Sequence, residues 1–207
     1  MKRTGGSTPV RPGPFSQRFG ALPARAFATL CLALCVATGQ ASRAESDAFD
    51  SIESRVKAAY LYKFGSYVDW PQQAFPAAQA PLQIGVLDDV ALADELSRMV
   101  QGRSVAGRPL QIRKLKSGDS LAGLNVLFVS KAHNGRLADI LSAAKAQPIL
   151  TVTEADNALS LGGIINFVPV EGRLRFEVSS RTAQLSHLSI SARLLAAAYK
   201  VENGAAP

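Results

Sequence analysis

Hydrophobic residues recur every three or four positions over residues 52–69, which is the spacing of an amphipathic helix. The dipeptide Trp70-Pro71 predicts the end of this helix, because a residue that precedes proline avoids the helical conformation. Residues 72–81 contain two further prolines and are expected to form a loop. The predicted apolar stripe consists of Ile52, Val56, Ala59, Tyr60, Phe64 and Tyr67.

Beyond Pro81, short apolar runs alternate with longer stretches that have helical periodicity. The runs at 124–130 and 149–153 are almost entirely apolar, which is typical of central strands that are buried on both faces. Residues 155–161 are expected to form a short helix or turn. The predicted strands are 82–87, 110–115, 124–130, 149–153, 164–170 and 173–178, and the remaining predicted helices are 90–100, 135–146 and 182–200.

This alternation predicts an α/β fold, a single three-layer domain in which helices cover both faces of a mostly parallel sheet. Glu171-Gly172 separates the last two predicted strands and is a signal for a tight hairpin, which would add an antiparallel edge. The fold would therefore begin with an amphipathic helix and end with a β-hairpin plus a helix. Residues 45–54 are expected to be a flexible lead-in and residues 202–207 a polar tail.

The basic charge of the chain is concentrated before residue 45. The formal net charge is +7, but residues 1–44 contain six basic residues and no acidic ones, so the remainder is almost neutral. This distribution argues against a nucleic-acid partner for the folded part. The folded part is thus expected to act on some other class of partner.

Residues 1–44 have the features of a secretory signal peptide. Their apolar run, 26–37, is shorter than the roughly 20 residues that a membrane-spanning helix needs. Small residues near Ala44 predict export to the periplasm with cleavage after Ala44, or alternatively after Ala41. The competing interpretation is that residues 1–44 remain attached as an uncleaved anchor. Cleavage would remove Cys31 and Cys35, which excludes thiol catalysis, disulfides and cysteine metal sites from the mature protein.

Polar residues follow several predicted strands, where open α/β sheets bind their ligands. They are Asp88-Asp89, Ser130-Lys131 and Thr153-Glu154. The favoured alternative is that the acidic residues cap the helices that follow. Ser130, His133 and Asp139 form the only close hydrolase-like trio, but no nucleophile elbow surrounds Ser130. We therefore predict no catalytic residue, cofactor or metal, and a hydrolase that uses Ser130 is the least favoured hypothesis.

Four residues are candidates for contacts with a ligand or partner: Lys63, Trp70, Arg175 and Arg193. The N-terminal helix is rich in aromatic residues, and Trp70 is either a core residue or part of an interface. Arg173 and Arg175 lie two positions apart, so they share one face of a strand. Arg175 or Arg193 is expected either to pair with Glu171 or Glu177, which is the favoured alternative, or to contact a carboxylate or phosphate on a small ligand or a partner protein.

Several segments, taken in order, resemble the YfiR family of exported bacterial proteins. The resemblance covers roughly residues 55–201. Its motifs are VKAAYLYKF at 56–64, VDWP at 68–71, GRP at 107–109, VLFVS at 126–130, PILTVT at 148–153, GGIIN at 162–166, GRLRFE at 172–177 and ISARLL at 190–195. The matching blocks include Lys63, Arg175 and Arg193.

The resemblance implies a periplasmic regulator with an α/β fold, often a dimer. Such a protein binds the periplasmic part of an inner-membrane diguanylate cyclase and represses it, which lowers cyclic-di-GMP signalling and biofilm formation. Some members carry disulfides, which this chain would lack after cleavage. The alternative function is a periplasmic small-molecule-binding protein for an anionic or aromatic ligand, with or without a sensor partner.

We predict that the protein recovered from the periplasm begins at Glu45, or at Ser42 if cleavage follows Ala41. N-terminal sequencing and intact mass of the protein from a periplasmic extract would measure this. Recovery of the chain only from the cytosol, with Met1 or its leader still attached, would contradict export.

Overall fold

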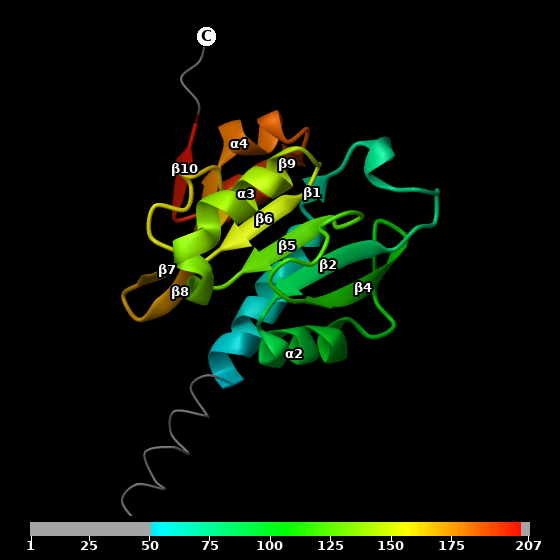
Figure 1. Ribbon diagram of the computed structural model, residues 1–207, viewed down its shortest axis with the longest axis horizontal. Helices are drawn as coiled ribbons and strands as arrows, with labels where there is room; N and C mark the ends of the chain where they lie inside the picture. Colours follow the sequence, from blue (N-terminus) through cyan, green and yellow to red (C-terminus); the bar gives the residue numbers. More distant parts are fainter. Residues whose placement is uncertain (1–50, 204–207) are drawn as a thin grey trace, which may run out of the picture. The chain divides into compact units, whose positions relative to one another are not determined.

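The computed structural model describes residues 51–203, so the predicted signal peptide, most of the lead-in and the end of the tail lie outside the described residues (Figure 1). Among residues 51–203 the largest sheet has eight strands in the order β10-β8-β7-β6-β5-β2-β4-β3. The strands are β2 Leu82–Leu87, β3 Ser104–Val105, β4 Arg108–Leu115, β5 Val126–Val129, β6 Leu150–Thr153, β7 Ile165–Val170, β8 Arg173–Ser179 and β10 Lys200–Glu202.

Five neighbouring strands, β4, β2, β5, β6 and β7, run parallel. β8 returns antiparallel to β7 through Glu171 and Gly172, whose φ angles of 50° and 71° fit a tight hairpin turn. The predicted α/β class, parallel sheet and hairpin are therefore confirmed. The hairpin does not form the edge of the sheet, because β10 pairs with the outer side of β8.

Helices cover both faces of the sheet. One face packs against the N-terminal helix (residues 51–65) and α2 (Val90–Val100), and the other packs against α3 (Leu137–Lys145). Figure 1 shows α3 on the near side and the N-terminal helix on the far side. The four residues of β5 alternate between these two cores and are all buried, which confirms that this apolar run is a central strand.

The N-terminal helix packs through only part of the predicted stripe, because Phe64 is buried and Tyr60 and Tyr67 pack against the core while partly exposed. Ala58, Leu61 and Phe64 are fully or almost fully buried, whereas Ile52 and Val56 are 56% and 38% exposed. The ring of Phe64 lies 5.2 Å from that of Phe176 and 5.9 Å from that of Phe167, so an aromatic cluster fixes the helix over β7 and β8. The buried face also includes Lys57, Ala58 and Leu61, which the predicted stripe omits.

This helix is also shorter than predicted at its C-terminal end. It stops at residue 65, and β1 (Val68–Asp69) instead pairs antiparallel with β9 (Ser189–Ile190). A single 3-10 turn, η1 (Gln72–Ala74), follows in the predicted loop. At the other end residues 51–54 are already helical, so the predicted lead-in is too long.

The predicted helix 182–200 is wrong. The segment forms α4 (Ser180–Leu185), β9, α5 (Ala192–Ala197) and β10, and Glu202, which was placed in the tail, belongs to β10. His187 has a φ of 58°, a left-handed conformation that interrupts a helix. Ser179 and Ser191 each accept a hydrogen bond from the first turn of a short helix, so the chain has two capped starts where periodicity suggested one.

Two smaller differences concern the connections around β6. The predicted helix 135–146 begins with a 3-10 segment, η2 (Lys131–Arg136), before α3. Residues 155–161 form turns, which is the second of the two expected alternatives.

We predict that Leu61→Ala lowers the free energy of unfolding by about 2–5 kcal/mol, because Leu61 is fully buried beneath the N-terminal helix. The matched control is Leu161→Ala, whose side chain is 46% exposed and should cost less than about 1 kcal/mol. Urea denaturation of both variants measures the difference. Equal losses would show that the helix is not packed on the sheet as described.

Candidate functional site

A buried lysine joins the N-terminal helix to the carboxyl end of the sheet. The Nζ atom of Lys57 lies 2.6 Å from Oε1 of Glu53, one helical turn earlier, and in direct contact with Oε2 of Glu154, which follows β6. The side chains of Lys57 and Glu154 are only 9% and 12% exposed, whereas that of Glu53 is 52% exposed. A backbone N–H group from Lys131, just after β5, donates to the other oxygen of Glu154 at 3.2 Å.

These contacts shift the pKa values of Lys57 and Glu53. Burial alone disfavours the charged form of Lys57, but the hydrogen bonds to Glu154 and Glu53 outweigh it and raise the pKa of Lys57. The hydrogen bond from Lys57 lowers the pKa of Glu53 below its ordinary value. Lys57 and Glu53 are therefore charged at neutral pH. Glu154 binds Lys57 instead of capping a helix as expected.

A cleft of about 800 Å³ opens beside this lysine, at the carboxyl ends of the parallel strands. Its wall is formed by the start of the N-terminal helix, the ends of β5 and β6, and the β7–β8 hairpin. The apolar lining residues are Ile52, Val56, Phe167, Pro169 and Leu174, and the polar ones are Glu53, Lys131, Asn134, Glu154, Asp156 and Arg173, with Gly172 at the hairpin tip. An apolar wall with a few charged groups is typical of small-ligand sites.

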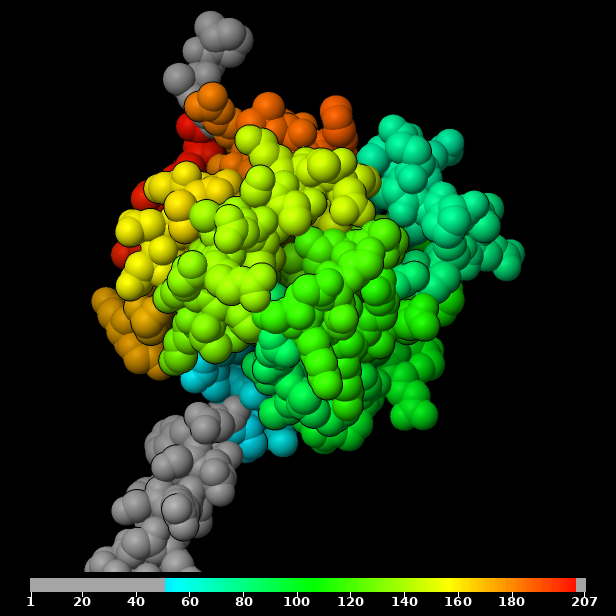
Figure 2. Space-filling model, in the orientation of Figure 1, coloured from blue at the N-terminus to red at the C-terminus, as the bar shows by residue number. Residues whose placement is uncertain are grey.

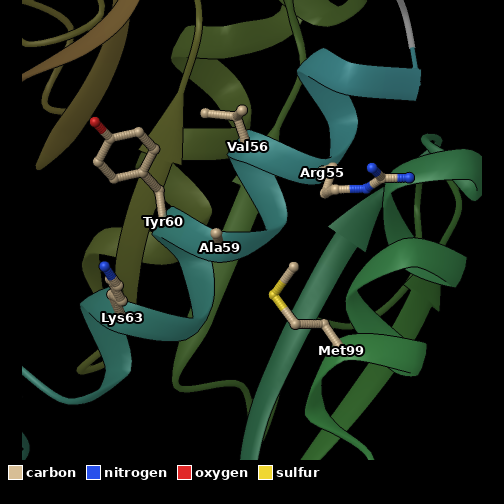
Figure 3. A pocket seen from close by; sticks show the side chains of 6 residues that line it. All are labelled: Arg55, Val56, Ala59, Tyr60, Lys63 and Met99. Carbon is tan, nitrogen blue, oxygen red and sulfur yellow. The ribbon is translucent and has the colours of Figure 1, made fainter. Parts of the chain in front are cut away.

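A second hollow of about 330 Å³ lies on the other side of the same helix, against α2 (Figure 3). Val56 lines both this hollow and the cleft. The other lining residues are Arg55, Ala59, Tyr60, Lys63 and Met99. In the orientation of Figure 2 the sheet lies in front of most of the helix, and only its first turns reach the visible surface.

The structure does not bring the four candidate contact residues together. Lys63 is exposed beside the second hollow, and no ion-pair partner for it lies within residues 51–203. Trp70 is partly buried against the core, and its indole N–H donates to the carbonyl of Asn125 at 3.2 Å. Arg175 alternates with the buried Phe176 along β8, so it faces away from the N-terminal helix, and Arg193 is exposed on α5.

The expected pairing of these arginines is not found. Within the described part of the chain, no ion pair joins Arg175 or Arg193 to a carboxylate, whether from Glu171, Glu177 or another residue. Both residues are exposed, and within residues 51–203 neither guanidinium group is engaged in an ion pair. Their proposed role as contacts stays a prediction.

The hydrolase-like trio is not assembled. Nε2 of His133 lies 3.3 Å from Oδ2 of Asp88, and the contact between His133 and Ser130 is a backbone hydrogen bond. Asp89 accepts a hydrogen bond from the N–H of Leu92 and caps α2, as the alternative interpretation expected. Over residues 51–203, no cluster of three or more His, Cys, Asp or Glu side chains is arranged to hold a metal ion.

Sequence reasoning missed Lys57 as a site residue. A lysine between apolar residues is usually on the solvent side of a helix. The available signal was its spacing from Leu61 and Phe64, four and seven positions later, which puts it on the buried face.

A protein-family model described as YfiR/HmsC-like matches residues 54–199. The match covers nearly all of the folded part and agrees with the limits of the resemblance noted above. No curated protein matches the chain. In the described residues, no helix combines the length and apolar character required to cross a bilayer.

We predict that Lys57→Met lowers the free energy of unfolding at neutral pH by about 1–3 kcal/mol. The loss is smaller than for a fully buried pair because water reaches Glu53. The pKa of Glu53 is lowered in the folded protein, so its contribution is present above the ordinary value of 4.5 and disappears as pH falls through the folded pKa. Wild-type protein should therefore lose more stability than the variant between about pH 6 and pH 3.

Urea denaturation across this pH range measures both effects. Lys145→Met removes an exposed lysine on α3 and should leave both the neutral stability and the acid slope of the wild type unchanged. Parallel acid profiles for wild type and Lys57→Met would show that Lys57 does not hold Glu53 ionised.

Proposed function

Because the chain belongs to the YfiR/HmsC-like family, we propose that it is a periplasmic regulatory protein that binds and represses an inner-membrane diguanylate cyclase. Repression lowers cyclic-di-GMP signalling and biofilm formation. The signal peptide at 1–44 delivers the protein to the compartment where the periplasmic part of such a cyclase is accessible. We further propose that the protein is a homodimer, as the resemblance implies.

The observation that carries this proposal is the exposed surface of the N-terminal helix. Ile52 and Val56 present aliphatic side chains to solvent on successive turns, between the cleft and the second hollow. A single exposed aliphatic residue has no special meaning, but an apolar strip bordered by charged residues and hollows is typical of a protein-binding surface. Ala58, Leu61 and Phe64 on the opposite face of the helix are buried in the core and hold this strip in place, which supports recognition of a partner.

A binding role also agrees with the chemistry of the strand ends. Lys57 is held there in ion pairs with both Glu53 and Glu154. Among residues 51–203, no histidine side chain is hydrogen-bonded to Ser130, which does not support the hydrolase hypothesis. We therefore propose no reaction for this protein.

The cleft supports a second candidate function, a periplasmic small-molecule-binding protein. Its volume of about 800 Å³ is in the range of ligand pockets, and Lys131 and Arg173 offer positive charge to an anionic or aromatic ligand. Both functions are compatible, since a ligand in the cleft would touch the helix that we assign to the partner surface.

We predict that tagged protein expressed with its leader enriches one inner-membrane diguanylate cyclase from detergent-solubilised membranes. Deletion of the gene should raise cellular cyclic-di-GMP, and the full chain should restore the wild-type level. A variant that lacks residues 2–44 is the matched control, because it stays in the cytosol and should not restore it. Mass spectrometry and nucleotide quantification are the measurements.

Failure to enrich any cyclase, together with unchanged cyclic-di-GMP in the deletion strain, would contradict the regulatory function. Enrichment that appears only after a metabolite is added would favour the combined function.

A further inference from the structure

The hollow between the N-terminal helix and α2 has an apolar floor. Val56, Ala59 and Met99 line it, and the ring of Tyr60 forms one end (Figure 3). Val56 is 38% exposed, and Met99 is partly buried. Methionine is unbranched and adapts its shape to an incoming side chain, so this floor suits a protein contact. At about 330 Å³ the hollow is at the small end of ligand pockets and accommodates one or two large apolar side chains.

The rim of this hollow is basic. Arg55 and Lys63 line it on the N-terminal helix, and Arg98 is exposed on α2. Glu95 on α2 forms ion pairs with two of these basic residues, because its carboxylate lies 3.5 Å from Nε of Arg55 and 2.7 Å from an Nη of Arg98. Lys63 has no ion-pair partner within residues 51–203.

The nearby surface adds to this positive charge. The guanidinium of Arg103 lies 5.3 Å from the ring centre of Tyr62. Tyr62 is on the N-terminal helix, next to Lys63 in the sequence. Two further acidic residues on the same helices form ion pairs with other lysines, Glu53 with Lys57 and Asp94 with Lys114, at 2.6 Å in each pair. The rim therefore carries positive charge that the described residues do not balance.

We propose that this hollow is the docking site for an acidic segment of the cyclase's periplasmic part, which inserts an apolar side chain between carboxylates that face Arg55 and Lys63. This proposal rests on the proposed function and adds the chemistry of the partner. Complementary charge around a small apolar centre steers association and fixes the register of the contact.

Other occupants fit the hollow less well. A second copy placed by two-fold symmetry would bring an identical basic rim against this one, and like charges at an interface are unfavourable. A membrane surface requires apolar side chains that project outward, whereas Ala59 and Met99 line a recess. An acidic protein segment satisfies both the charge and the shape.

The test uses Lys63→Glu, because Lys63 is exposed and makes no ion pair that the change would break within residues 51–203. Its matched control is Lys145→Glu on α3, which makes the same charge change on the opposite face of the sheet. Binding is measured by titration calorimetry against the purified periplasmic domain of the cyclase enriched from membranes. We expect Lys63→Glu to weaken binding about tenfold and Lys145→Glu to leave it unchanged.

A second pair of variants tests the apolar part separately. Ala59→Phe fills the hollow without a change in charge, and Ala143→Phe, at an exposed position of α3, is its control. We expect only Ala59→Phe to weaken binding. Substitution of one partner carboxylate by lysine should restore binding to Lys63→Glu, and circular dichroism confirms that each variant is folded.

The outcomes separate this proposal from the proposed function. If the wild-type chain does not bind the domain at all, the proposed function fails. If wild type binds and both Lys63→Glu and Ala59→Phe bind equally well, the function stands and the docking site is wrong. If sedimentation shows that these variants change the oligomeric state while binding to the domain is unchanged, the occupant is a second copy and the proposal is overturned.

Discussion

The ion pairs of Lys57 hold the start of the N-terminal helix against the carboxyl end of the sheet, and the surfaces described here depend on that attachment. Glu53 belongs to the helix and Glu154 follows β6, so a single ammonium group connects two segments that are distant in sequence. A buried ion pair adds little net stability over an apolar contact of similar volume. Its contribution here is geometric, because an unpaired buried charge would result if the helix rotated or slid.

The aromatic cluster restrains the other end of the same helix. Phe64 packs against Phe167 and Phe176 on the hairpin strands, while Leu61 fills the space between the two anchors. With both ends fixed, Ile52 and Val56 are held toward solvent and Lys63 is held beside the second hollow. Val56 lines both the cleft and the hollow, so a molecule bound in one of them would lie next to the other. A regulator with this arrangement can couple a ligand to a partner through one rigid element.

The sequence predicts the central strands well because their signal is local. A run such as 149–153 is apolar throughout, since both of its faces are covered, and the structure places β6 at Leu150–Thr153. The final third was harder to predict, because the break near His187 depends on β9 pairing with β1, more than a hundred residues earlier. Periodicity alone does not reveal a capped restart such as the one at Ser191.

Some residues of the candidate site can also be predicted from the sequence, whereas others are revealed only by the fold. Lys63 was predicted from its motif and does lie at a hollow, whereas the importance of Lys57 depends on Glu154, which only the fold brings near. Arg175 and Arg193 were chosen for their charge and are exposed on other surfaces. Hydrogen–deuterium exchange with and without the cyclase's periplasmic domain tests whether the partner binds over the N-terminal helix and α2, as we propose. We expect slower exchange in peptides from residues 51–65 and 90–100, with no change in α3. Slower exchange in α3, with the N-terminal helix unaffected, would show that the partner binds elsewhere.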